Sequence, residues 1–248
     1  MTKRLFTNLA LLVMSITLTL TGCSSTRSDD DEVLEELASL DKQTIFDRAE
    51  ALYADKEYVE ARKYFSFVYD TFPNDPLGHK AALRVADTYA AKADPTSRTE
   101  ARLRYRDFAN RYPNDPDRDY ALLMVGNTYS SKNIRPDRDL TNLHEAYTAY
   151  QQLTTLYPNS RYAEEAQSRI VALRETLAEH EWLVAQFYYR NRRWQGALWR
   201  LEYLQENYPD YSKIEDVNSL VEEINSKVAE FAETYRKLLE ERSKSQER

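Results

Sequence analysis

The stretch EARKYFSFVYDTFPND (residues 60–75) returns almost unchanged forty residues later as EARLRYRDFANRYPND (residues 100–115). Two weaker copies follow, EAYTAYQQLTTLYPNS (residues 145–160) and GALWRLEYLQENYPDY (residues 196–211), and all four align without a gap. A sequence repeats at a near-constant spacing when a structural unit repeats. The stretch therefore predicts an array of similar units.

A common frame runs through the four copies. Counted from the alanine of each copy, large apolar residues stand at positions 4, 7 and 11, and a proline stands at position 12. Those spacings place the apolar side chains on one face of a helix. Proline cannot continue the helix, because it lacks an N–H and its ring clashes with the preceding turn. The alanines are Ala61, Ala101, Ala146 and Ala197, and the prolines are Pro73, Pro113, Pro158 and Pro209.

A partner helix is predicted upstream of each alanine. Ala86 precedes Tyr89, and Gly126 precedes Tyr129, so each segment has a small residue and then an aromatic residue three positions later. The small residue allows close helix packing, and the larger one fills the space beside it. Small, aromatic, alanine, aromatic and then proline, in two antiparallel helices, resembles the tetratricopeptide repeat. The resemblance covers about residues 40–210 and implies an all-α tetratricopeptide-repeat solenoid of about five helix pairs.

Two further segments extend the solenoid. Residues 160–189 contain no helix breaker, so we expect one long helix or two helices in line between the third and fourth repeats. After Pro209, apolar residues at Ile214, Val217, Val221, Ile224, Val228, Phe231 and Tyr235 predict a last amphipathic helix that caps the array.

The composition favours a helical binding protein over an enzyme. The chain has 248 residues, 30% of them charged, with four glycines and a net charge of −7. No nucleotide-binding loop or nucleophile elbow is present, and the three histidines lack metal-ligand spacing. We expect no catalytic site and no metal, and the acidic balance makes nucleic acid an unsuitable partner.

The N-terminus is typical of an exported lipoprotein. Lys3 and Arg4 precede an apolar stretch over residues 5–20, and the tetrad LTGC ends at Cys23. LTGC resembles the bacterial lipobox, which implies cleavage before Cys23 and attachment of lipid to that residue. We expect no cofactor other than this covalent lipid. The alternative is an ordinary cleavage site with an incidental cysteine. Ser24, which follows the cysteine, favours sorting of the lipoprotein to the outer membrane, where it would lie on the periplasmic face.

These signals divide the chain into four parts. We expect a signal peptide over residues 1–22, followed by the lipidated cysteine and a flexible tether over residues 23–40. The repeat domain would span residues 41–240, with N-terminal repeats over 41–135 and C-terminal repeats over 136–240. Residues 241–248 would form a disordered tail.

A closer resemblance lies in the C-terminal repeats. PDRDLTNLHEAYTAYQQLTTLYPNSRYAEEAQSRI (residues 136–170) and LAEHEWLVAQFYYRNRRWQGALWRLEYLQENYPD (residues 177–210) are similar to the BamD family of lipoproteins. That family belongs to the machine that inserts β-barrels into the bacterial outer membrane. The resemblance implies a scaffold whose C-terminal repeats dock the barrel insertase and whose N-terminal repeats offer a groove to unfolded barrel proteins. The alternative is a lipoprotein that scaffolds a cell-wall, pilus or secretion complex.

Two surfaces are predicted to bind partners. The first helices of tetratricopeptide repeats line the concave side, where we expect a peptide groove. Its residues are Phe46, Glu50, Tyr53, Leu83, Asp87, Leu123 and Asn127. The C-terminal dock comprises Trp182, Gln186, Tyr189, Arg190 and Arg200, with Arg200 suited to a bidentate pair with a carboxylate. The alternatives are an ordinary solvated solenoid face and arginines that only solvate a turn.

Overall fold

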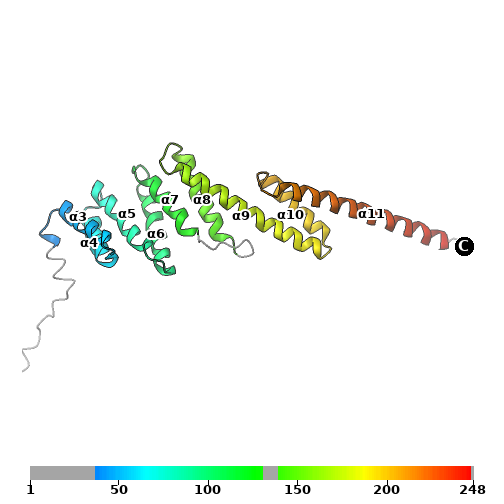
Figure 1. The fold of residues 1–248 in the computed structure, drawn as a ribbon, viewed down its shortest axis with the longest axis horizontal. Coiled ribbons are helices and arrows are strands. Elements are labelled where there is room, and N and C mark those ends of the chain that lie inside the picture. Colours follow the sequence, from blue (N-terminus) through cyan, green and yellow to red (C-terminus); the bar gives the residue numbers. More distant parts are fainter. Residues whose placement is uncertain (1–36, 131–138, 247–248) are drawn as a thin grey trace, which may run out of the picture.

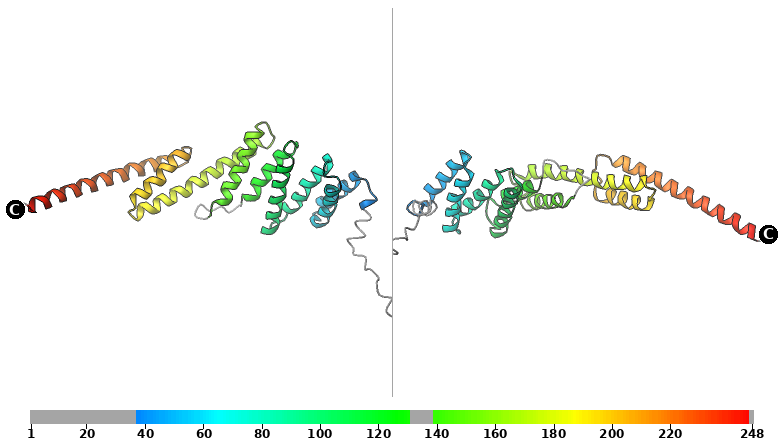
Figure 2. Two further views of the ribbon diagram at one scale, coloured as in Figure 1. Left: turned by 180° about the vertical axis from the view of Figure 1, so that it is seen from behind. Right: turned by 90° about the horizontal axis from the view of Figure 1, so that it is seen from below.

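The computed structural model describes residues 37–130 and 139–246, and over these residues the chain is entirely helical, with nine helices and no strand. Four helix pairs follow one another along an elongated array, and a long final helix extends from its end (Figures 1 and 2). The pairs are α3 (Lys42–Ala54) with α4 (Tyr58–Thr71), α5 (Pro76–Ala90) with α6 (Pro95–Arg111), α7 (Arg118–Tyr129) with α8 (Thr141–Leu156), and α9 (Ala163–Arg190) with α10 (Trp194–Asn207). The final helix is α11 (Ile214–Gln246). The predicted all-α solenoid is confirmed, with four pairs and one unpaired helix rather than five pairs.

The residues of the repeat frame form the buried face of the second helix in each pair. Each alanine and most of the apolar residues that follow it at positions 4 and 7 have no exposed surface. These fully buried residues are Ala61, Phe65, Val68, Ala101, Tyr105, Ala146, Tyr150, Leu153, Ala197, Leu201 and Leu204. The aromatic residue at position 11 is the C-cap of its helix in all four copies, so each helix ends directly before the predicted proline.

The two helices of a pair come into close contact because the first helix of the pair has a small residue. Gly126 of α7 faces the ring of Tyr150 on α8, and a Cβ at position 126 would lie 2.3 Å from a ring carbon. Ala86 occupies the matching position of α5 and is fully buried. The structure therefore confirms the packing role that the sequence predicts for the small residue.

Helix starts are fixed by aspartates in the turns. Asp75 accepts a hydrogen bond from the N–H of Leu77 at 2.9 Å, and Asp94 accepts one from the N–H of Ser97 at 2.8 Å. Such N-caps satisfy backbone donors that the first helical turn leaves unpaired. Helix α6 begins at Pro95, directly after the Asp94 cap, so the polar residues 95–100 lie in its first turns.

The core is divided at α5. Ala81 and Val85 pack with α3 and α4, whereas Leu83 and Ala86 join the apolar residues of the later helices. Both faces of α5 are therefore buried, and this helix links the first repeat to the rest of the array.

The ends of the repeat domain differ from the predicted boundaries. Leu37 is buried in the first core cluster, so ordered packing begins within the segment predicted as tether. At the other end α11 continues through Gln246, into the segment predicted as a disordered tail. Val217 and Ile224 of α11 are fully buried, but Phe231 and Tyr235 are exposed. The final helix therefore caps the array with its first half alone. Cys23 and the signal peptide lie outside the described residues.

Candidate binding surfaces

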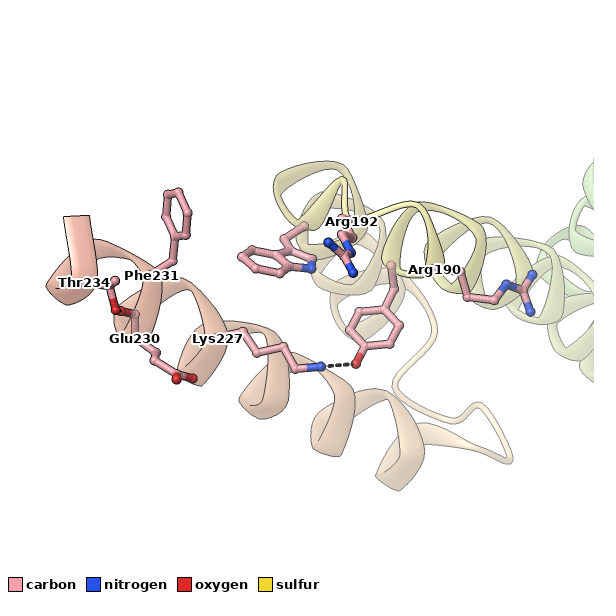
Figure 3. Close-up of a pocket in the computed structure, with 8 residues that line it drawn as sticks. Arg190, Arg192, Lys227, Glu230, Phe231 and Thr234 are labelled. Carbon is pink, nitrogen blue, oxygen red and sulfur yellow. Dashed lines mark hydrogen bonds between the residues drawn. The ribbon is translucent and has the colours of Figure 1, made fainter. Parts of the chain in front are cut away.

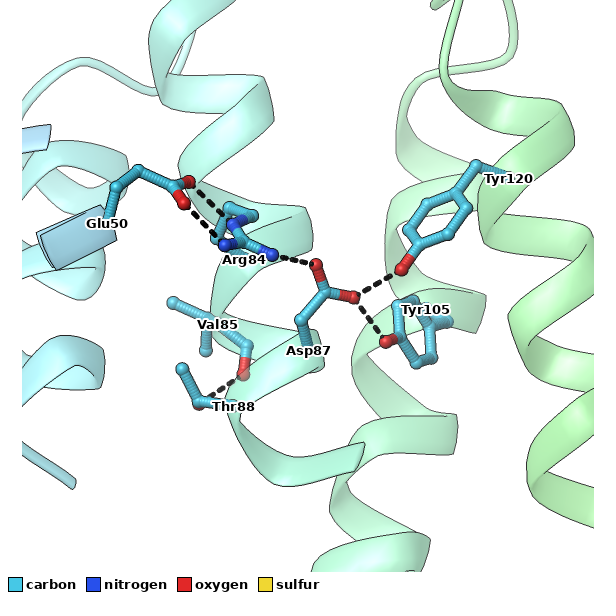
Figure 4. A network of polar contacts seen from close by, with 7 residues as sticks. All are labelled: Glu50, Arg84, Val85, Asp87, Thr88, Tyr105 and Tyr120. Carbon is cyan, nitrogen blue, oxygen red and sulfur yellow. Dashed lines mark hydrogen bonds and ion pairs between the residues drawn. The ribbon is translucent and has the colours of Figure 1, made fainter. Parts of the chain in front are cut away.

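An ion-pair network crosses the N-terminal repeats. Arg84 of α5 binds both carboxylate oxygens of Glu50 on α3, and its Nη1 donates to Asp87 at 2.9 Å (Figure 4). The hydroxyls of Tyr105 on α6 and Tyr120 on α7 donate to the other oxygen of Asp87, the latter at 2.7 Å. The network thus joins four helices of three repeats, and three of these helices, α5, α6 and α7, meet at the buried carboxylate of Asp87.

The network keeps both tyrosines protonated. Burial, reinforced by the charge of Asp87, raises the pKa of Tyr105 and the pKa of Tyr120 far above the ordinary value. Their hydroxyls therefore remain hydrogen-bond donors to Asp87 throughout the physiological range. This arrangement fixes the relative positions of α5, α6 and α7.

Aromatic rings surround the exposed end of the network. The guanidinium of Arg84 lies 4.0 Å from the ring centre of Tyr53, and the rings of Phe46 and Phe65 meet edge to face at 5.3 Å. Phe46, Glu50 and Tyr53 are each half-buried on α3. These three residues, together with Arg84, form a surface that a peptide can contact, and we call it the α3–α5 surface.

The other predicted groove residues lie deeper. Leu83 and Leu123 are 4% and 3% exposed and belong to the core, and Asp87 is buried in the network. Asn127 is half-buried and accepts a hydrogen bond from the hydroxyl of Tyr150 at 2.7 Å. Leu83, Asp87 and Leu123 are therefore too buried to line an open groove, because the next repeat packs against this side of α5 and α7, whereas the placement of Asn127 in a groove stays a prediction.

Four of the five predicted dock residues come together at the C-terminal end. Trp182, Gln186, Tyr189 and Arg190 line one side of a hollow of about 390 Å³, and residues of α11 line the other. Trp182 is 8% exposed and forms the floor. The hydroxyl of Tyr189 donates to Glu223 of α11 at 2.5 Å, so this tyrosine joins the two helices.

Arg200 lies apart from that hollow, on α10. Its Nη1 donates to Glu181 at 2.9 Å, and its guanidinium lies 5.0 Å from the ring centre of Trp199. Trp199 is 61% exposed. Within the described residues, the Nε of Arg200 is buried and has no hydrogen-bond partner. The arginine therefore retains unused donor capacity beside an exposed aromatic ring.

Sequence reasoning missed two sets of residues. Arg84, Tyr105 and Tyr120 were not predicted to act together, since their partners are 18 to 34 residues away and no local pattern links them. Trp199 could have been found, because it stands two positions after Ala197, outside the buried frame, where a large aromatic residue is unexpected. An exposed tryptophan at such a position indicates a contact surface.

Two further observations concern membrane spans and metal sites. No helix within the described parts of the chain is long and apolar enough to cross a membrane. Among the same residues no three side chains of histidine, cysteine, aspartate or glutamate are grouped to hold a metal ion. The helix pairs and their two partly open surfaces define a helical-repeat scaffold.

Comparison with known families identifies the scaffold further. The chain belongs to the YfiO family, whose model, described as an outer membrane lipoprotein, matches residues 39–238. The resemblance to the BamD family read from the sequence is thereby confirmed, and family membership associates the chain with the outer membrane.

Individual relatives of the chain are named BamD, the family that the sequence resembles. Over 76 residues the chain is 43% identical to the outer membrane protein assembly factor BamD of Vibrio cholerae serotype O1, covering 31% of this chain and 32% of the relative. The BamD of Haemophilus influenzae is 32% identical over 76 residues, 31% of this chain and 29% of the relative. These two matches therefore span less than a third of each relative. The BamD of Neisseria gonorrhoeae is 26% identical over 220 residues, 86% of this chain and 82% of the relative. All three are named as assembly factors, in agreement with the prediction that the chain is not an enzyme.

Proposed function

We propose that this chain is an outer-membrane lipoprotein scaffold of the β-barrel assembly machinery. Lipid on Cys23 would hold it on the periplasmic face of the outer membrane, where the C-terminal repeats dock the barrel insertase. The match to the family model over residues 39–238 and the similarity to assembly factors named BamD support this function.

The observation that carries the docking proposal is the surroundings of Arg200. The side chain of Arg200 is 30% exposed, makes a single ion pair with Glu181 and lies beside the exposed Trp199, so its guanidinium can bind a further carboxylate. Arginine and tryptophan dominate the energetics of many protein interfaces. An acidic residue on a periplasmic domain of the insertase would complete the site, with Trp199 covered by apolar surface.

The hollow around Tyr189 supports a contact of the same partner at a second point. Gln186 and Arg190 face it beside Asp216 and Glu223, so its lining is polar and carries both signs of charge. A partner surface that is mixed in charge fits such a lining better than a uniformly acidic one.

The N-terminal repeats would recruit unfolded outer-membrane proteins. The α3–α5 surface offers the rings of Phe46 and Tyr53 beside the charged pair of Glu50 and Arg84. Aromatic side chains next to hydrogen-bonding groups suit an extended peptide, which presents apolar side chains and unpaired backbone groups together.

Affinity purification from detergent-solubilised envelope tests the docking site. The wild-type chain is compared with Arg200→Glu and with a matched control, Arg169→Glu, which reverses an exposed arginine of α9 paired with Glu165 at 3.3 Å. We expect the insertase to co-purify with the wild type and the control, and to be lost with Arg200→Glu. If the insertase co-purifies with all three proteins, the proposed membership of the assembly machinery stands, but the proposal that Arg200 docks the insertase is refuted. Cell-wall, pilus or secretion proteins without insertase would refute the proposed function.

A further inference from the structure

Two hollows lie at equivalent places in the array, each between the second helices of neighbouring pairs. One lies between α4 and α6 and has a volume of about 20 Å³, whereas the other lies between α6 and α8 and has a volume of about 180 Å³. The intervening first helix lines both, with Ala82 and Val85 of α5 in one and Leu122 and Val125 of α7 in the other. The same repeat geometry therefore leaves one groove nearly filled and the next one open.

Two alanines account for the difference in volume. The first groove contains Tyr69 of α4, eight positions after its frame alanine, and Arg104 of α6, three positions after its frame alanine. The second groove has Ala109 of α6 and Ala149 of α8 at the same two positions of the frame. The space that a tyrosine and an arginine occupy in the first groove is therefore open in the second, which we call the α6–α8 groove.

The floor of the α6–α8 groove is apolar. Ala109, Leu122, Val125 and Ala149 all line it, and each is only 3–6% exposed. An apolar cavity of about 150 Å³ is large enough to hold a benzene molecule. The groove is thus large enough for one leucine or phenylalanine side chain, and burial of such a side chain strengthens binding by about tenfold to a hundredfold.

The rim of the α6–α8 groove carries two amide groups that are available to a ligand. Asn110 of α6 and Gln152 of α8 line the groove from its two walls, and neither side chain bonds to another residue within the described parts of the chain. The hollow of about 500 Å³ where α9, α10 and α11 meet is different, because there the amine of Lys227 already donates to the hydroxyl of Tyr189 at 2.6 Å (Figure 3). A side-chain amide both donates and accepts hydrogen bonds, so it can pair with the N–H and C=O groups of a peptide backbone.

The charges on the rim are balanced. Arg106 of α6 donates to Glu145 of α8 at 3.2 Å, and both residues line the groove. These two are the charged residues of its lining, so the groove has no excess charge with which to attract a strongly acidic or strongly basic ligand.

We propose that the α6–α8 groove binds an extended, uncharged peptide segment of another protein. One leucine or phenylalanine side chain of the segment would fill the hollow, and its backbone would bond to Asn110 and Gln152. A helical segment satisfies its own backbone groups and has no use for the two amides, whereas an extended segment leaves those groups unpaired. Unfolded β-barrel proteins present such segments, and in naming them as the ligand the inference rests on the proposed function.

Fluorescence anisotropy with a short labelled peptide, in which leucine and serine alternate, tests the groove. The protein is the mature chain with Cys23→Ser, so that no detergent is required. Ala149→Arg introduces the residue that the preceding repeat has at this position, and it should weaken binding by about tenfold or more. The control Ala172→Arg makes the same change at an exposed alanine of α9 and should leave the dissociation constant within about twofold. Circular dichroism should show unchanged helix content in both variants.

Replacing Asn110 and Gln152 together by alanine tests the role of the amides. Each lost hydrogen bond weakens binding by about fivefold, so the double variant should lose about tenfold or more in affinity without any change in the volume of the hollow. A peptide in which serine replaces every leucine should not bind. Equal binding of the two peptides, or no binding of the leucine peptide to the unsubstituted chain, would overturn the proposal.

Tyr53→Ala separates the α6–α8 groove from the α3–α5 surface, to which Tyr53 belongs. If Tyr53→Ala abolishes binding and Ala149→Arg leaves it unchanged, the peptide is held at the α3–α5 surface alone. That result would overturn the α6–α8 groove but leave the proposed recruitment of unfolded proteins intact. Loss of affinity in Ala149→Arg but not in Ala172→Arg is the result that the open groove predicts.

Discussion

Replacing Asp87 by alanine removes the carboxylate at which α5, α6 and α7 meet. Arg84 loses its bond to Asp87 but retains Glu50, whereas the hydroxyls of Tyr105 and Tyr120 lose their acceptor in a buried site. Breaking a buried ion pair by removing one partner costs about 3–5 kcal/mol, and unpaired buried donors account for much of that cost. Because Arg84 keeps one partner, we expect a loss at the lower end, about 3 kcal/mol. For a domain of this size that corresponds to a fall in Tm of about 6–12 °C.

Thermal and urea unfolding, followed by circular dichroism at 222 nm, measure this loss. Asp107→Ala is the matched control, since Asp107 is an exposed aspartate of α6 paired with Arg111 one helical turn away. Exposed pairs of this kind contribute about 0.5 kcal/mol or less, so the control should change Tm by about 1–2 °C. Equal shifts in the two variants would refute the conclusion that the network joins the N-terminal repeats.

Three further changes probe packing, electrostatics and capping. Gly126→Ala should destabilise the chain by about 1–2 kcal/mol in urea unfolding despite alanine's better helix propensity, because the new Cβ meets the Tyr150 ring; a gain in stability would contradict the close contact. Burial raises the pKa of Glu179, but hydrogen bonds from Lys213 and Tyr211 and the charge of Lys213 together outweigh it, so the pKa is lowered. The stabilising effect of Glu179 is therefore present above about pH 4.3 and lost as the pH falls through the lower folded pKa. The stability difference between wild type and Lys213→Met should accordingly be largest above about pH 5 and shrink as the pH falls through the lowered pKa of Glu179 in pH-resolved unfolding; a difference that grows in acid would refute this sign. Asp94→Ala should speed amide hydrogen exchange in the first turn of α6 and leave α7 unchanged, and unaltered exchange would show that the cap has no role.

Local pattern determines most of the fold. Phe65, Tyr105 and Tyr150 are fully buried where the frame predicts them, and each second helix stops directly before its proline. These features depend on residues fewer than thirteen positions apart, so a single copy of the repeat contains the information. The boundary near Leu37 was missed because one buried leucine in an acidic stretch has no periodicity.

The binding surfaces depend on contacts between repeats, and the sequence predicts them less well. The frame correctly assigns Phe46 and Tyr53 to one face of α3, but it cannot tell that the next repeat covers Leu83 and Leu123. The apolar face of α11 illustrates the same limit, because Val217 and Ile224 are buried whereas Phe231 is exposed. Periodicity shows which face of a helix is apolar, but it does not show whether the partner belongs to the same chain.

Site-specific photocrosslinking in living cells tests the central claim most directly. A photoreactive amino acid replaces Trp199, which is 61% exposed beside Arg200, or Val171, a control on α9 that is 55% exposed. A scaffold that docks the barrel insertase through this surface predicts a crosslink to the insertase from position 199 and none from position 171. Crosslinks from position 199 only to other envelope proteins, or equal crosslinks to the insertase from both positions, would contradict the account.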